Sequence, residues 1–142
     1  MNIELKNAEG YYDPTAYEAI KNASCDEETI NRNIVYICSP LRGDIARNQN
    51  KALGYCRFVI SKGFIPIATH LIFPQFMDDC DEKDREKTME MCLEILSRCD
   101  ELWCFGEKLS EEMAQEMDFA KKYKIKIRLF TDLCDPLPQK EA

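Results

Sequence analysis

The stretch "NIVYICSPLRGD" (residues 33–44) decides the fold, because it joins an apolar strand to a helix through a short polar turn. Its first half is apolar and β-branched without alternation, which is typical of a strand covered on both faces of a parallel sheet. Its second half holds a proline, an arginine and a glycine. Asp44 can then cap a helix that runs to about Lys62, with Gly63 as its stop. The stretch therefore predicts a strand–turn–helix unit.

The turn itself has two interpretations on these residues alone. It is either an ordinary tight turn, with Gly43 for its conformation and Arg42 in solvent, or a phosphate site. In the second interpretation the N–H groups of the helix N-terminus, the Ser39 hydroxyl and the Arg42 guanidinium meet at one anion.

The chain beyond this unit alternates between short apolar runs and amphipathic segments. Strands are expected at 64–68, 101–105 and 125–130, and helices at 85–99 and 110–123. Pro66 places the first of these strands at a sheet edge. The core stripe of the helix after Asp44 is expected to comprise Ile45, Ala52, Leu53, Cys56, Val59 and Ile60. Strands that alternate with helices predict an α/β fold with a small, mostly parallel sheet of four to five strands.

These runs also predict the domain organisation. Residues 1–31 form a polar N-terminal extension with a short helix near 14–23, whose tyrosines can dock it onto the body. Residues 32–133 form the α/β domain, and residues 134–142 form a loose tail.

Composition narrows the classes of partner. The 142 residues carry a net charge of −7, which argues against an extended nucleic-acid surface and leaves only small phosphate ligands. No window reaches the roughly 18 apolar residues of a membrane span, and the N-terminus lacks a signal-peptide pattern. Eight cysteines contain no CxxC pair, and His70 is the only histidine. We therefore expect a cytoplasmic protein with reduced thiols, no metal site, no cofactor and no membrane partner.

Candidate site residues follow from the rule that ligands of open parallel sheets bind at the carboxyl ends of the strands. Glu116 falls about 60° from Met113 inside the apolar stripe of the helix at 110–123. It is either a stripe-edge residue or internal ion pair, or a nucleophile or base at a cleft. His70 is either a core residue or a ligand contact, and Ser110 is either a helix cap or a hydroxyl at the same rim.

The order of these features resembles the nucleoside 2-deoxyribosyltransferase superfamily, and most of all its 2'-deoxynucleoside 5'-phosphate N-hydrolase branch. The features are strand–Ser-Pro-x-Arg-Gly, a histidine after the second strand, Cys-Asp before the third, and Ser-x5-Glu-x3-Ala, within residues 33–131. The resemblance implies a flavodoxin- or Rossmann-like three-layer sandwich. It also implies cleavage of the N-glycosidic bond of a nucleotide, by hydrolysis or transfer, in a homodimer.

The resemblance also implies roles for individual residues. Glu116 would be the nucleophile that attacks the anomeric carbon of the sugar. The residues implied in binding the substrate and its phosphate are Tyr36, Ser39, Pro40, Arg42, Gly43, Asp44, His70 and Ser110.

Two positions depart from the pattern of that branch. Cys92 stands where the branch has an aspartate that assists departure of the base, and Glu112 stands where the family often has glycine. A thiol is a poor substitute for a carboxylic acid, since its reference pKa is about 8.5. Either another acid takes over, or the protein binds nucleotides without efficient turnover. The candidates for that acid are Asp78, Asp79, Glu90 and Asp100.

Overall fold

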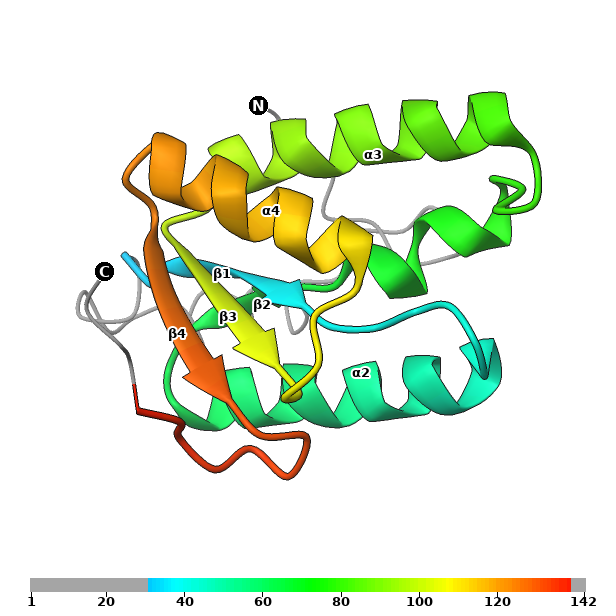
Figure 1. Cartoon of the computed structure of the whole chain (residues 1–142). Helices are drawn as coiled ribbons and strands as arrows, with labels where there is room; N and C mark the ends of the chain where they lie inside the picture. Colours follow the sequence, from blue (N-terminus) through cyan, green and yellow to red (C-terminus); the bar gives the residue numbers. More distant parts are fainter. Residues whose placement is uncertain (1–30, 139–142) are drawn as a thin grey trace, which may run out of the picture. The chain divides into compact units, whose positions relative to one another are not determined.

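The computed structural model describes residues 31–138, and the helix expected near 14–23 lies outside them. Four parallel strands form one sheet in the order β2-β1-β3-β4 (Figure 1). The strands are β1 (Ile34–Cys38), β2 (Ile65–Ile67), β3 (Glu101–Phe105) and β4 (Lys126–Phe130). The helices are α2 (Ile45–Ser61), α3 (Glu82–Ser97) and α4 (Glu111–Lys122), with 3-10 turns η2 (Thr69–Leu71) and η3 (Phe73–Gln75). The expected α/β fold with a four-stranded parallel sheet is confirmed.

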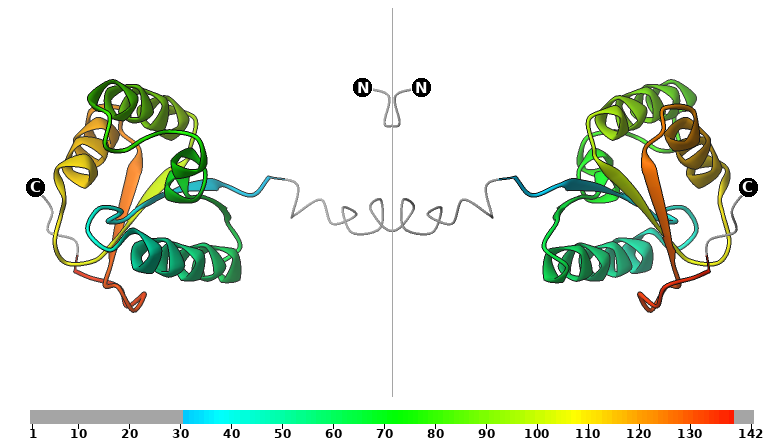
Figure 2. Two further views of the ribbon diagram at one scale, coloured as in Figure 1. Left: turned by 90° about the vertical axis from the view of Figure 1, so that its right-hand side faces the viewer. Right: turned by 90° about the vertical axis from the view of Figure 1, so that its left-hand side faces the viewer.

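The described part of the chain is a three-layer sandwich. Helix α2 covers one face of the sheet, and α3 and α4 cover the other (Figures 1 and 2). Side chains alternate between the faces along β1, so that Tyr36 and Cys38 join the core beneath α3 and α4, while Val35 and Ile37 join the core beneath α2. This burial on both faces explains why β1 reads as an unbroken apolar run.

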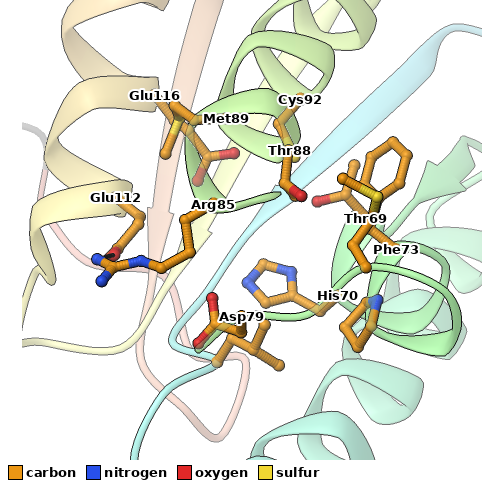
Figure 3. A pocket seen from close by; sticks show the side chains of 13 residues that line it. Thr69, His70, Phe73, Asp79, Arg85, Thr88, Met89, Cys92, Glu112 and Glu116 are labelled. Carbon is orange, nitrogen blue, oxygen red and sulfur yellow. Dashed lines mark ion pairs between the residues drawn. The ribbon is translucent and has the colours of Figure 1, made fainter. Parts of the chain in front are cut away.

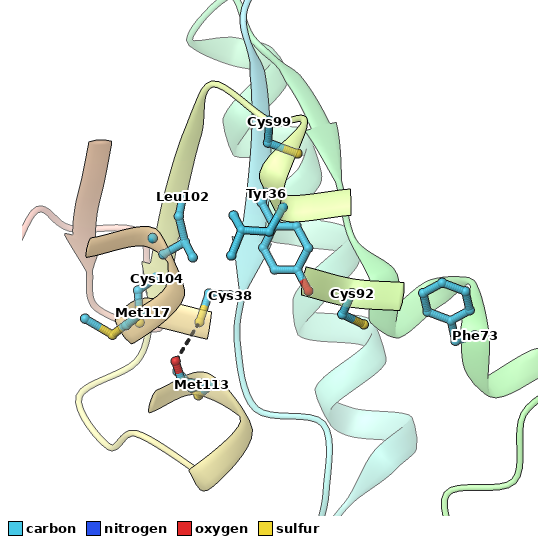
Figure 4. Packing of buried hydrophobic residues seen from close by; sticks show 11 residues of the cluster. Tyr36, Cys38, Phe73, Cys92, Cys99, Leu102, Cys104, Met113 and Met117 are labelled. Carbon is cyan, nitrogen blue, oxygen red and sulfur yellow. Dashed lines mark hydrogen bonds between the residues drawn. The ribbon is translucent and has the colours of Figure 1, made fainter. Parts of the chain in front are cut away.

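The two cores differ in composition. The core beneath α2 is aromatic: Tyr55 stacks on Phe105 at 4.2 Å between ring centroids, and Phe130 stacks on Phe105 at 5.2 Å. The core beneath α3 and α4 is rich in sulfur (Figure 4) and contains Cys38, Cys92, Cys99, Cys104, Met113 and Met117. Methionine side chains are flexible and fill irregular gaps in a core, and free cysteines pack there as small apolar residues. The seven cysteines of the described part are all free.

The strand order places a topological switch point between β1 and β3. The chain leaves β1 for β2 on one side, and β3 leads to β4 on the other. Pro66 lies in β2, an edge strand as expected, where its missing N–H costs no interior pairing. The carboxyl ends of β1 and β3 are therefore where this fold offers a ligand site.

The expected core stripe of α2 was partly wrong. Ala52 and Val59 are buried, but Ile45, Leu53 and Ile60 are exposed, and Tyr55 is buried in their place. At 100° per residue, Ala52, Tyr55 and Val59 share one narrow face, and Leu53 lies 100° from Ala52. The aromatic ring of Tyr55 fills the space that the smaller side chains leave beside Phe105.

The start of one helix also differs from expectation. Helix α3 begins at Glu82 rather than near 85, because the Asp81 carboxylate accepts a hydrogen bond from the Lys83 N–H and caps it. After β4 the chain makes a turn, and the Leu137 N–H donates to the Leu129 carbonyl at 2.9 Å.

Candidate functional site

A pocket opens at the carboxyl end of β1, between the η2–η3 segment and helices α3 and α4 (Figure 3). Its cavity of about 100 Å³ is smaller than the roughly 300–1,000 Å³ of pockets that enclose a whole ligand. The pocket therefore has room for part of a ligand, with the remainder at its mouth. The lining residues are Leu41, Thr69, His70, Phe73, Pro74, Met77, Asp79, Arg85, Thr88, Met89, Cys92, Glu112 and Glu116.

Glu116 projects from α4 into this pocket and is only 4% exposed. Burial raises the pKa of its carboxyl group to about 7, and the charge of Glu112 adds to the rise. Hydrogen bonds from Tyr36 and Cys38 lower the pKa and so favour the ionised form, with Cys38 Sγ 3.8 Å from Glu116 Oε1. The sequence left open an internal ion pair, and the structure gives Glu116 neutral hydrogen-bond donors instead.

Tyr36 links the sheet to the pocket. Its hydroxyl lies 3.3 Å from Thr69 Oγ1 and points towards Cys92 (Figure 4). Burial, followed by the charge of Glu116, raises the pKa of Tyr36 well above its usual value. Tyr36 is thus a neutral hydroxyl, able to donate to a carboxylate.

His70 and Ser39 carry buried polar atoms that have no partner. His70 Nδ1 and Ser39 Oγ are both inaccessible and make no hydrogen bond. Burial lowers the pKa of His70, so its imidazole is neutral. Native proteins leave few buried polar atoms unpaired, and each one needs an explanation, such as a ligand. The His70 side chain lines the same cavity as Glu116.

Arg42 is an exposed residue whose guanidinium makes two ion pairs. Its Nε lies 3.2 Å from Asp79 Oδ2, and its Nη1 lies 3.5 Å from Glu112 Oε1. Arg85 Nη2 lies 3.7 Å from that same Glu112 oxygen. Two guanidiniums and two carboxylates therefore meet at the mouth of the pocket.

The other residues expected to bind phosphate make local contacts in this structure. Gly43 has a φ of +99°, a conformation that favours glycine, so the turn requires it. Asp44 caps α2, with its Oδ1 3.1 Å from the Arg47 N–H. Ser110 caps α4, with its Oγ 3.2 Å from the Met113 N–H. Of the residues expected to bind the substrate, only His70 lines the pocket. The side chains outside the lining set are Tyr36, Ser39, Pro40, Arg42, Gly43, Asp44 and Ser110.

Cys92 lines the pocket. It stands at the position where the 2'-deoxynucleoside 5'-phosphate N-hydrolase branch has an aspartate. Burial raises the pKa of the Cys92 thiol, while hydrogen bonds with Thr69 and Tyr36 oppose that rise. Of the four alternative acids, Asp79 lines the pocket, whereas Asp78, Glu90 and Asp100 do not. Asp100 accepts a hydrogen bond from the Ile34 N–H and so lies at the opposite end of the sheet.

Sequence reasoning missed several residues of the site. Arg85 and Thr88 fall within the helix predicted at 85–99, but neither was singled out as a site residue. Phe73 and Met77 come from the η2–η3 segment, which was expected to be a loop. The capping residue Asp81 was the signal that would have extended the predicted helix back to Glu82.

Residues 31–138 contain neither a metal-binding cluster nor a membrane-spanning helix. No group of three or more His, Cys, Asp or Glu side chains is arranged to hold a metal ion there. Within the same residues, no helix combines the length and apolar character needed to cross a membrane.

Comparison with known proteins places this geometry in context. The fold is similar to that of a 2-deoxyribosyltransferase from the psychrotolerant bacterium Bacillus psychrosaccharolyticus, with a TM-score of 0.57 and 13% sequence identity. The superposition covers 69% of this chain and 72% of that chain, which supports the deoxyribosyltransferase-like fold. No curated protein sequence matches the chain significantly. A family model described as "Domain of unknown function (DUF7768)" matches residues 33–130, more than half of the chain, and the protein therefore belongs to that family.

Proposed function

We propose that this protein cleaves the N-glycosidic bond of a deoxynucleoside 5'-monophosphate or a related nucleotide, with Glu116 as nucleophile. The observation that carries the proposal is the Glu116 carboxyl group, buried in a pocket at the switch point and hydrogen-bonded by neutral donors. Burying a carboxylate costs free energy, and such a group with a perturbed pKa in a cleft is a functional candidate. The fold of a 2-deoxyribosyltransferase supports the same class of chemistry.

The proposed reaction has two displacement steps. The Glu116 carboxylate attacks the anomeric carbon, and the bond from that carbon to the base breaks with its electron pair leaving on the base. Asp79, the one of the four alternative acids that lines the pocket, is paired with Arg42. The departing base therefore takes its proton from water. Water or a second base then attacks the same carbon and releases Glu116, which gives hydrolysis or transfer respectively.

The surrounding side chains would tune the nucleophile. The Tyr36 hydroxyl and the Cys38 thiol hold the carboxylate in place and favour its ionised form. The neutral His70, with its free Nδ1, would contact the sugar or the base. Arg42, with the turn from Ser39 to Asp44 and Ser110, would position the phosphate. Binding energy at the phosphate would then orient the sugar for attack.

The test is incubation with a panel of deoxynucleoside 5'-monophosphates, followed by chromatography for the free base. We expect release by the wild type and a fall of about 1,000-fold or more for Glu116→Ala, the order seen when a nucleophile is removed. Arg42→Ala should raise KM by about tenfold or more while kcat changes less. Absence of release by the wild type would refute the proposal.

A second candidate function rests on Cys92. A buried thiol with a raised pKa lines the pocket where an acid is expected, which favours a module that binds or sequesters nucleotides with weak turnover. Tight binding without base release, lost in Arg42→Ala, would favour this alternative. Cys92→Asp should then raise the rate of base release.

We also propose that the protein forms a homodimer. The resembling family commonly forms homodimers in which neighbouring chains complete the site. We therefore expect a homodimer, which light scattering coupled to size-exclusion chromatography will test.

A further inference from the structure

Two arginines at the mouth of the pocket share one carboxylate oxygen. Arg42 Nη1 and Arg85 Nη2 lie 3.5 Å and 3.7 Å from Glu112 Oε1. Arg42 belongs to the turn after β1. Arg85 belongs to the first turn of α3 and lies beside Glu112 (Figure 3). Two guanidiniums that converge on one oxygen form an anion-binding arrangement, and the anion here is the chain's own carboxylate.

The shared contact is weak enough to be exchanged. Both distances exceed the roughly 2.7–2.9 Å of strong charge-assisted hydrogen bonds. The three side chains are between 35% and 41% exposed, so solvent screens the attraction. A phosphate monoester carries more negative charge than a carboxylate and has three strong acceptor oxygens. It would therefore compete effectively with Glu112 for the two arginines.

The position of Glu112 relative to Glu116 suits a nucleotide. The two glutamates are four residues apart on α4, about 6 Å along the helix axis, and both line the pocket. In a deoxynucleoside 5'-monophosphate, the sugar ring and one methylene group separate the anomeric carbon from the phosphate. An anion in the place of the Glu112 carboxylate would therefore leave the sugar next to Glu116.

We propose that Arg85 and Arg42 form a two-arginine clamp for the 5'-phosphate of the substrate, and that Glu112 is an internal placeholder which the phosphate displaces. This inference rests on the proposed function, since it assigns the phosphate subsite of the same pocket. Asp79 holds Arg42 Nε at 3.2 Å, which turns the guanidinium towards the clamp and leaves Nη1 for the phosphate. A ligand must therefore bind the two arginines more strongly than the Glu112 carboxylate does.

The clamp is tested by binding rather than turnover. Isothermal titration calorimetry compares 2-deoxyribose 5-phosphate with 2-deoxyribose on the full chain. We expect Arg85→Ala to weaken binding of the phosphorylated sugar by about tenfold or more. Glu112→Gln should tighten it several-fold, because the competing charge is gone. Arg57→Ala is the matched control, since it removes the same charge from an exposed position on α2 outside the pocket.

Several results would overturn the clamp. One is an Arg85→Ala variant that binds 2-deoxyribose 5-phosphate as tightly as Arg57→Ala does. Another is a Glu112→Gln variant with unchanged or weaker binding, a readout that stands even if Arg85→Ala fails to fold. A third is a wild type with no preference for the phosphorylated sugar. Base release reports separately on the proposed function: a working clamp without release refutes the reaction alone, and release with an unaffected Arg85→Ala refutes the clamp alone.

Discussion

Glu116 is a carboxyl group whose burial sets its chemistry. With a pKa of about 7, it is about half protonated at neutral pH, and only the ionised half can attack a sugar. Its partners Tyr36 and Cys38 act against burial by donating to the ionised form. The pH dependence of the proposed reaction is therefore set by Glu116, Tyr36 and Cys38 together.

Removal of the Tyr36 hydroxyl should shift that pH dependence upward. Tyr36→Phe deletes a hydrogen bond that lowers the pKa of Glu116, so the pKa rises. The rising limb of kcat/KM against pH, centred near 7 in the wild type, should move to higher pH. Tyr55→Phe is the control, because Tyr55 packs in the aromatic core on the other face of the sheet. An unmoved limb in Tyr36→Phe would disprove the assignment.

Single residues were predictable where a periodic pattern exposed them. Glu116 stood out because a charge interrupted an apolar stripe, and the structure buries it as that pattern indicated. The hydrogen bond from Cys38 to Glu116 was not predictable, because it joins residues 78 apart in sequence. The same holds for Arg85, which meets Glu112 only through the packing of α3 beside α4.

At the scale of elements, α4 carries most of the candidate site. Its cap is Ser110, its first turn holds Glu112, and its buried face presents Glu116. Acidic residues in the first turn and Lys121 and Lys122 in the last complement the helix dipole. A change at the cap therefore affects both the stability of the helix and the placement of the nucleophile.

Loss of the cap should destabilise the protein measurably. Ser110→Ala removes the acceptor of the Met113 N–H and should lower the free energy of unfolding by about 1 kcal/mol. Ser110→Asn keeps a capping oxygen and should restore most of that loss. Chemical denaturation monitored by circular dichroism gives both values. Equal stability of the wild type and Ser110→Ala would contradict the capping role.

Element boundaries were less predictable than element types. The strands at 101–105 and near 125–130 matched because apolar runs mark them directly. The start of α3 was missed because its first turn is charged throughout and has no apolar periodicity. In α2 the apolar residues cover a wider arc than the core contacts, so composition could not tell Leu53 from Tyr55.

At the scale of the described domain, the ionised form of Glu116 that the proposed reaction needs is also the form that destabilises the fold, because the carboxyl group is buried. Folding raises the pKa of the Glu116 carboxyl group from about 4.5, the value of an exposed glutamate, to about 7. The folded state therefore binds more protons between these values. Stability should fall as the pH rises from about 4.5 to about 7.

Glu116→Gln should remove the loss of stability that accompanies ionisation of the buried carboxyl group. At pH 8 the variant should be more stable than the wild type by up to about 3 kcal/mol, and the gain should vanish near pH 4. Thermal unfolding at both pH values checks the sign. Glu111→Gln is the control, since Glu111 is an exposed carboxylate on the same helix. A gain that is equal at both pH values would show that the buried charge is not its cause.

The central claim is that Glu116 attacks the anomeric carbon and forms a covalent bond to the sugar as the base leaves. Mass spectrometry of the protein tests this most directly. The protein is incubated with a deoxynucleoside 5'-monophosphate whose sugar bears a 2'-fluorine, which slows breakdown of a glycosyl–enzyme bond. We predict release of the base together with an added sugar phosphate on the peptide that contains Glu116, and neither in Glu116→Gln. Release of the base with Glu116 unmodified, or an adduct on another side chain, would contradict the claim.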